Sequence, residues 1–315
     1  MPDPVLPPLR SLLKSREVED PVNVYVHRPL AYAFVWAVYR TPVTPNAVTL
    51  LAMLVGLTAG GLWIWGAPGA MLAGGILLWA SAILDGADGI LARAKRMQSD
   101  FGRALDGSAD MIVAAGTVLP AFYHIFLTTD WDPVYVVGSP FALVLTLVHL
   151  YMYDYYKESY LRMTRLDRGG EGQDASAVKA KLEAKKGEMG PITRLAVIIV
   201  LLPFLNAQTR MVALTNPLAL REGRRFVRNE ETAHIYRTHN AGPMRLWAAI
   251  SLAPHSYLMA ICGMADRLDL YFWIRLVGMN VLWLAVLVWQ RRATRRTMEE
   301  LREIGAVPPA VAQEA

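Results

Sequence analysis

The chain is almost without cysteine and has only a small excess of charge, and both shortages narrow its possible functions. Cys262 is the only cysteine among 315 residues, which excludes an internal disulfide and a zinc site built from cysteines. The formal net charge is +5, so we expect basic side chains to meet lipid headgroups and substrate phosphates rather than nucleic acid. Residues 1–20 lack the apolar core of a secretory signal peptide, so the first hydrophobic span is expected to serve as its own insertion signal.

Apolar residues, by contrast, are abundant and come in long blocks. They make up 54% of the chain and give a mean hydropathy of +0.27, which is high for a soluble protein with 19% charged residues. A helix needs about 20 mostly apolar residues to cross a bilayer. We therefore predict an all-α, polytopic membrane protein with six transmembrane helices. The six predicted spans are 46–66, 69–92, 104–127, 134–162, 243–263 and 268–290.

The sequence before the first predicted span divides into two parts. Residues 1–22 contain five prolines and are predicted to form a flexible N-terminal arm. The segment 23–40 mixes aromatic and basic residues, which favours an amphipathic helix in the membrane interface over a further span. The prolines of 41–46 end this helix, and Asn46 is well placed to cap the next one.

A long charged stretch separates the fourth and fifth predicted spans. It contains one apolar run, from Ile192 to Leu205, which is about six residues short of a span. We interpret the stretch 164–242 as a cytoplasmic insert with an interfacial helix. The predicted division of the chain is a flexible arm at 1–22, the interfacial helix and four spans at 23–163, the insert at 164–242, two spans at 243–292, and a cytoplasmic tail at 293–315 that is helical to about Ile304.

Basic residues concentrate on one side of the predicted spans. The loops at 66–69, 128–133 and 264–268 carry little positive charge, whereas the opposite loops and the Arg291–Arg296 cluster are rich in lysine and arginine. The positive-inside rule places that side and both termini in the cytoplasm. This design is typical of a bacterial inner (plasma) membrane protein.

Four aspartates lie at the facing ends of the second and third predicted spans. Asp85 and Asp88 are three residues apart, and Asp106 and Asp110 are four residues apart, so each pair shares a helix face. A tight turn at 94–101 allows the two pairs to converge. Carboxylates are costly at membrane helix ends unless something binds them. Their number and arrangement suit a pair of hard cations such as Mg²⁺ or Mn²⁺, and all four aspartates are therefore candidate metal ligands.

Other residues of this segment suit a diphosphate ligand. Gly89 and Ala92 keep one helix face small, so that a nucleotide diphosphate can approach the backbone. Arg93 can pair with a phosphate, although such a residue can also simply snorkel to the interface. Gly102 either has an unusual φ or clears space for the ligand. Asp110 lies deepest in the third span, which suits a base that deprotonates an alcohol.

The spacing resembles the signature of the CDP-alcohol phosphotransferases, and it has no departure at the defining positions. The pattern is Asp85-x2-Asp88-Gly89-x2-Ala92-Arg93-x8-Gly102-x3-Asp106-x3-Asp110. The resemblance implies a six-helix membrane enzyme, often a homodimer, that moves a phospho-alcohol unit from a CDP-linked donor to a second alcohol and releases CMP. It implies that Asp85, Asp88 and Asp106 hold two divalent cations. Asp110 is then the catalytic base and a further metal contact.

The resemblance also assigns residues to the nucleotide. Asp88, Gly89, Ala92, Arg93 and Gly102 are expected to lie against the CDP. Asn46 and Thr49 are expected to approach its cytidine end.

The donor and the acceptor stay open at this stage. We favour CDP-diacylglycerol with a small alcohol acceptor, because this donor is usual in bacteria. The alternative is a donor of the CDP-choline or CDP-ethanolamine type acting on a lipid alcohol. A cation transporter is a remote third possibility, because acids also line transporters, although usually near the middle of the membrane. A phosphorylated acceptor would need arginines near the fourth and fifth spans, and each candidate can also be an ordinary positive-inside charge. The candidates are Arg162, Arg194, Arg237 and Arg245.

Overall fold

A computed structural model describes most of the chain. The described residues are 5–13, 17–166, 175–184, 190, 194–195, 197–221 and 227–306. Helices joined by turns account for their regular structure, and the described residues contain no strand, which confirms the all-α class. Seven of the described helices are long and apolar enough to cross a membrane, against six predicted. The contacts divide the chain into two compact units, Met1–Leu145 with Ser251–Asn280 and Thr146–Ile250 with Val281–Ala315. The predicted five-part division of the chain stays a prediction.

The first unit begins with short helical segments. After α1 (Leu9–Leu12), the segments η1 (Asn23–His27) and α2 (Arg28–Val38) follow each other directly, so the expected helix within 23–40 is present. Its place in the membrane interface stays a prediction.

The next helix, α3 (Pro45–Trp65), begins two residues earlier than a cap at Asn46 would allow. Thr44 is the capping residue, and its hydroxyl accepts a hydrogen bond from the Ala47 N–H at 3.3 Å. The prediction that Asn46 caps this helix is therefore wrong. The physical reason is that Pro45 has the backbone angle and the missing N–H that suit the first helical position, which moves the cap to the residue before it.

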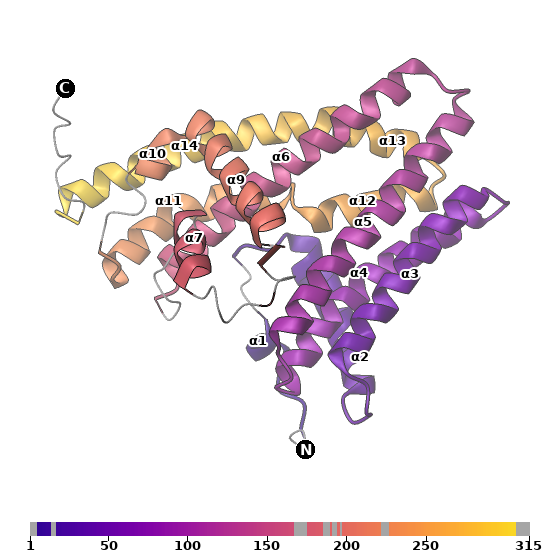
Figure 1. Cartoon of the computed structure of the whole chain (residues 1–315), viewed down its shortest axis with the longest axis horizontal. Helices are drawn as coiled ribbons and strands as arrows, with labels where there is room; N and C mark the ends of the chain where they lie inside the picture. Colours follow the sequence, from indigo (N-terminus) through magenta and orange to yellow (C-terminus); the bar gives the residue numbers. More distant parts are fainter. Residues whose placement is uncertain are drawn as a thin grey trace. The chain divides into compact units, whose positions relative to one another are not determined.

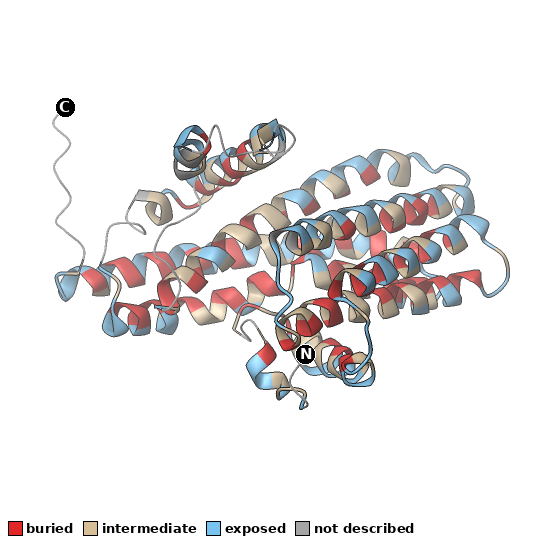
Figure 2. Ribbon diagram, turned by 60° about the horizontal axis from the view of Figure 1, so that its bottom comes forward, coloured by how far each residue is buried: buried red, intermediate tan, exposed pale blue. Residues whose placement is uncertain are grey.

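Helices α3, α4 (Ala70–Ala94) and α5 (Asp100–Thr128) run side by side (Figure 1). Their buried residues face inward and their outer sides are exposed (Figure 2). Large apolar side chains such as Leu54, Leu72 and Leu119 are among the exposed ones. That pattern suits helices whose outer surface meets lipid, because lipid tails are as apolar as leucine.

A five-residue turn, 95–99, joins α4 to α5 within the segment 94–101, where the sequence predicted a tight turn. Arg96 adopts the left-handed conformation with φ 56°, and the Met97 N–H donates to the Ala92 carbonyl at 2.8 Å. Ser99 then caps α5, since its hydroxyl accepts from the Gly102 N–H at 2.9 Å. These local bonds end one helix and begin the next, so the two ends that carry the aspartates are neighbours.

Helix α12 (Leu252–Met264) packs on α4 in the same unit. A Cβ on Gly75 would lie 2.6 Å from the Ala260 carbonyl oxygen. The helix α13 (Leu268–Trp273), the segment η3 (Ile274–Gly278) and residues 133–145 also belong to this unit. Buried aromatic side chains, including Trp63, Phe122 and Phe272, fill its core.

The second unit takes residues from several helices. They are α6 (Pro133–Thr164), α7 (Ala175–Ala184), η2 (Val197–Leu201), α9 (Leu202–Thr215), α10 (Pro217–Arg221), α11 (Glu230–Ala248) and α14 (Met279–Glu303). The end of α14 at Glu303 confirms the prediction of a helical tail to about Ile304. Buried amides join α11 to α14, since Gln290 Nε2 donates to Asn240 Oδ1 at 2.8 Å.

The candidate span that the sequence did not predict is Val197–Thr215. The apolar run in the sequence ends at Leu205, but the helix continues because polar residues after it find partners in the same unit. Gln208 Nε2 donates to the Tyr151 carbonyl at 3.0 Å and to Asp154 Oδ2 at 3.1 Å. A count of apolar residues alone underestimates such a helix. Its predicted place at the interface stays a prediction.

The closest approach of α3 to α5 gives a test of the fold. A Cβ on Gly60 would lie 1.8 Å from the Gly116 carbonyl oxygen, so Gly60→Ala must separate the two backbones. We expect this variant to melt at a clearly lower temperature in detergent. Gly61→Ala is the matched control, because nothing lies within 4 Å of a Cβ there. It should melt at the same temperature or slightly higher, since alanine favours the helix by about 1 kcal/mol. Equal melting temperatures for the two variants would contradict the close contact.

Candidate active site

Three aspartates meet where α4 ends and α5 begins. Asp85 and Asp88 come from α4 and Asp106 from α5, and one carboxylate oxygen of each lies within 4.8 Å of the other two. Asp88 is 6% exposed, while Asp85 and Asp106 are partly buried. The side chain of Asp110, one turn further along α5, lies within hydrogen-bonding reach of Asp85. The structure therefore brings all four sequence-predicted aspartates to one place.

The three clustered carboxylates fit a divalent cation. A single ion with metal–oxygen distances of about 2.0–2.6 Å spans about 4–5 Å between opposite ligand atoms. The 4.8 Å spread of the carboxylate oxygens agrees with that span. Oxygen donors alone, with no sulfur or imidazole among these three residues, suit Mg²⁺ or Mn²⁺ rather than softer metals.

Thr49 supports this cluster from α3. Its hydroxyl donates to Asp88 Oδ2 and also lies 3.2 Å from the Pro45 carbonyl oxygen. Thr49 is itself buried. The contact fixes the orientation of one carboxylate, which is what a residue behind a metal ligand commonly does.

Gly102, near the start of α5, lies beside Asn46, in the first turn of α3. A Cβ on Gly102 would lie 3.1 Å from Ser99 Oγ and 3.3 Å from Asn46 Oδ1. Gly102 is not among the positive-φ residues, so the expectation of an unusual φ is wrong, and the alternative that it clears space for the ligand stays a prediction. The α-helical conformation at this position follows from the Ser99 cap, which starts the helix before the glycine.

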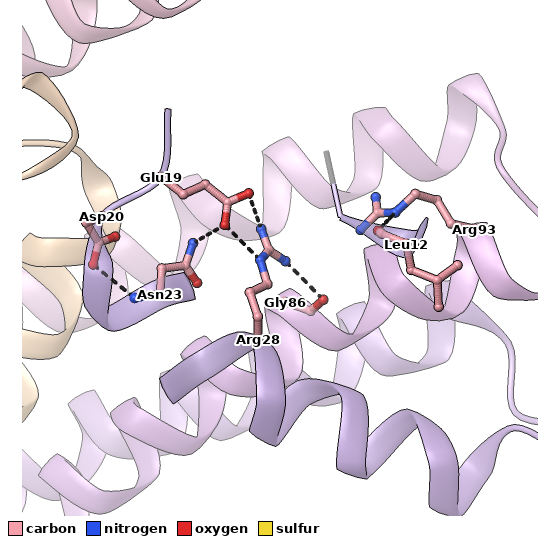
Figure 3. Close-up of polar contacts among 7 residues, drawn as sticks. All are labelled: Leu12, Glu19, Asp20, Asn23, Arg28, Gly86 and Arg93. Atoms are coloured by element: carbon pink, nitrogen blue, oxygen red, sulfur yellow. Dashed lines mark hydrogen bonds and ion pairs between the residues drawn. The ribbon is translucent and has the colours of Figure 1, made fainter. Parts of the chain in front are cut away.

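Arg93 bends back over Gly89 on the same face of α4. A Cβ on Gly89 would lie 3.3 Å from Arg93 Nη1 and 3.5 Å from Nη2, so any larger residue would crowd the guanidinium. Arg93 Nε donates to the backbone carbonyl of Leu12 in the N-terminal arm (Figure 3). Ala92, beside it, is partly buried.

Arg28 is a residue near the site that the motif does not include. Its Nη1 donates to the Gly86 carbonyl at 3.3 Å, directly after Asp85, and its Nε and Nη2 contact the Glu19 carboxylate at 2.9 and 3.2 Å. Burial lowers the pKa of the adjacent His27. No local sequence signal points to Arg28, because its partner on α4 is 58 residues away.

The four arginines proposed for the acceptor belong to the second unit. Arg237 Nη2 donates to the Thr164 carbonyl at 3.2 Å, at the end of α6 that also carries Arg162. Arg162 lines a shallow recess together with Tyr155 and Tyr236. The remaining two differ in exposure, since Arg245 is exposed and Arg194 is partly buried.

Helices of membrane-spanning length and a carboxylate cluster define a polytopic membrane protein with a candidate cation site. Residues 42–221, more than half of the chain, match the model of the family described as CDP-alcohol phosphatidyltransferase. The chain belongs to this family.

Two curated relatives support the assignment. The bifunctional IPC transferase and DIPP synthase of Aquifex aeolicus is 29% identical over 175 residues, which cover 56% of this chain and 36% of the relative. The CDP-diacylglycerol–serine O-phosphatidyltransferase of Mycobacterium tuberculosis is 33% identical over 105 residues, covering 33% of this chain and 35% of the relative. The chain thus spans about a third of the length of these relatives.

Members of the family are transferases of substituted phosphate groups that depend on divalent cations. The interpretation as a cation transporter is therefore dropped.

The contact between Thr49 and Asp88 gives a test of the site. Thr49→Val removes the hydroxyl and leaves Asp88 less well oriented, so we expect the Mn²⁺ concentration for half-maximal activity to rise by about tenfold. Thr58→Val, on the same helix, removes an exposed hydroxyl that bonds only to the Leu54 carbonyl and should leave this concentration unchanged. A Mn²⁺ titration of CMP release compares them. The same response in both variants would contradict a specific role for Thr49.

Proposed function

We propose that this chain transfers a phosphatidyl group from CDP-diacylglycerol to a small alcohol and releases CMP. The observation that carries the proposal is the convergence of Asp85, Asp88 and Asp106 to within 4.8 Å, where α4 also carries Arg93 one turn after Gly89. Carboxylates that can bind divalent metal, together with an arginine that can bind phosphate, suit a diphosphate donor that arrives with the metal. The name of the Mycobacterium tuberculosis relative supports CDP-diacylglycerol as that donor.

Four carboxylates take part in the proposed chemistry. Asp85, Asp88 and Asp106, with a contact from Asp110, hold two Mg²⁺ or Mn²⁺ ions, which neutralise the diphosphate charge when bound. Asp110 is the base. It accepts the proton of the acceptor hydroxyl as that oxygen attacks the phosphorus next to the diacylglycerol. The new O–P bond forms as the anhydride P–O bond breaks, and CMP leaves with the bonding electrons.

The remaining motif residues bind the nucleotide in this proposal. The Nη atoms of Arg93 donate to phosphate oxygens, and Gly89 and Ala92 leave room for them. Gly102 and Asn46, which adjoin each other, accommodate the cytidine end together with Thr49. Asp88 also lies against the nucleotide.

The acceptor and the cellular setting are further parts of the proposal. Arg162, Arg194, Arg237 and Arg245 are the candidates for binding a phosphorylated acceptor. We propose that the protein lies in the bacterial inner membrane with the active site and both termini in the cytoplasm, because of the charge distribution in the loops; this orientation has six crossings and leaves Val197–Thr215 at the interface. We also propose a homodimer, which rests on the family resemblance alone.

The role of Asp110 has a direct test. Asp110→Asn keeps the shape of the side chain but cannot accept the proton, so we expect a folded protein whose turnover falls by about 10²–10⁴-fold. Asp130→Asn is the control, because Asp130 is exposed in the loop after α5 and should keep full activity. Single-turnover CMP release and melting curves give the readouts. Normal turnover in Asp110→Asn would remove Asp110 from the reaction.

The donor is tested by offering CDP-diacylglycerol and CDP-choline separately to purified protein with Mn²⁺ and panels of acceptors. We expect CMP release with CDP-diacylglycerol only, and the accepted alcohol then names the product. Release with CDP-choline and a lipid alcohol only would reverse the donor assignment while keeping the site. Absence of CMP release with either donor would contradict the proposed reaction.

A further inference from the structure

The N-terminal arm crosses the helix that carries the aspartates. We call residues 5–13 and 17–20 the strap. At one place the Leu12 carbonyl accepts from Arg93 Nε, and at another Glu19 holds Arg28, which donates to the Gly86 carbonyl (Figure 3). The strap thus reaches α4 just after Asp85 and again one turn after Gly89.

Burial and local bonds hold the strap in place. Leu12 is 4% exposed and lies in one apolar cluster with Ile90 and Leu91 of α4. Tyr32 OH on α2 donates to the Pro7 carbonyl at 3.1 Å, which ties down the start of the strap. At its end, Asp20 Oδ1 accepts from the Asn23 N–H at 3.0 Å, and burial raises the pKa of Asp20. The strap is therefore a packed part of the first unit.

The contact with Leu12 determines which side of Arg93 can meet a ligand. A guanidinium has five N–H donors, four of them on the two Nη atoms. The Leu12 carbonyl engages the single Nε donor, and the Nη atoms lie over Gly89. The Leu12 carbonyl at Nε therefore orients the guanidinium without engaging its two Nη atoms. Those two atoms form the edge that can donate to a phosphate as a bidentate pair.

We propose that the strap is a positioning element of the diphosphate site. The Leu12 carbonyl fixes the Arg93 guanidinium so that its Nη edge faces the diphosphate, and the Glu19–Arg28 pair anchors the strap to the backbone next to Asp85. Fixing a side chain before binding saves the entropy of ordering it afterwards. This inference rests on the proposed phosphate-binding role of Arg93. The strap lies outside residues 42–221, the segment that matches the family model, so its role goes beyond what that match covers.

A strap over Arg93 could instead block the donor, and the two roles predict opposite signs. If the strap positions Arg93, its removal weakens binding of the diphosphate. If it blocks the site, its removal strengthens that binding. The engagement of Nε rather than Nη and the burial of Leu12 favour positioning.

The experiment measures Kd for CDP and for cytidine by equilibrium dialysis of the full-length protein with Mn²⁺. Deletion of residues 1–13 should weaken CDP binding about tenfold, as expected for one hydrogen bond to a charged group, and leave cytidine binding unchanged. In the Arg93→Lys background, which lacks the Nε donor and the fork, the deletion should have no further effect. This coupling separates positioning from general damage, which would weaken CDP binding equally in both backgrounds.

A second, smaller change keeps the proposal testable if the shortened protein does not fold. Tyr32→Phe removes only the hydroxyl that holds Pro7, and should weaken CDP binding by a smaller factor that also disappears with Arg93→Lys. Thr58→Ala is the control, because it removes an exposed hydroxyl that bonds to the Leu54 carbonyl on α3, outside the strap.

Four results would overturn the inference. Tighter CDP binding after deletion would show that the strap blocks the site. Unchanged CDP binding, or an equal loss in both Arg93 backgrounds, would remove the strap from the diphosphate site while leaving the proposed function intact. Wild-type protein that does not bind CDP would contradict the proposed function and the strap's role together.

Discussion

Mutual repulsion among closely spaced carboxylates is the constraint around which the first unit is arranged. Three acids within 4.8 Å at the end of two apolar helices are unfavourable without an opposing charge. The turn between α4 and α5 nevertheless forces them together, and Thr49 donates a hydrogen bond to one of them. Arg93 supplies positive charge on α4, whereas the charge of Arg28 is already paired with Glu19. A divalent cation would offset the carboxylate charge, and the diphosphate would bind to that cation. Metal binding, substrate binding and chemistry therefore all depend on the charge of the same carboxylates.

The sequence predicted those parts of the site that depend on local spacing. Acids three and four residues apart share a helix face, so Asp85 with Asp88 and Asp106 with Asp110 could be paired without a structure. Apolar block lengths likewise predicted most of the long helices. The supporting contacts could not be predicted, because they join distant residues or use backbone atoms. The separations along the chain are 39 residues for Thr49 to Asp88, 58 for Arg28 to Gly86 and 81 for Leu12 to Arg93.

The remaining mismatches have similar local causes. Asn46 was expected as a cap, but the backbone preference of the preceding proline moves the cap to Thr44. The helix Val197–Thr215 is longer than its apolar run because side-chain hydrogen bonds such as that of Gln208 satisfy its polar end. In the first place a proline's backbone preference decides the outcome, and in the second a polar contact does; a hydrophobicity pattern records neither. The strap belongs to this group, since its tie to Arg93 is a single backbone carbonyl.

The central claim is that the aspartates at the junction of α4 and α5 bind divalent metal together with the nucleotide. Electron paramagnetic resonance of free Mn²⁺, titrated with purified protein with and without CDP, tests this most directly. The account predicts that the protein removes Mn²⁺ from solution, that CDP tightens this binding, and that Asp106→Asn abolishes the tightening. Mn²⁺ binding that is absent, or that is identical in the wild type and in Asp106→Asn with CDP present, would contradict the account.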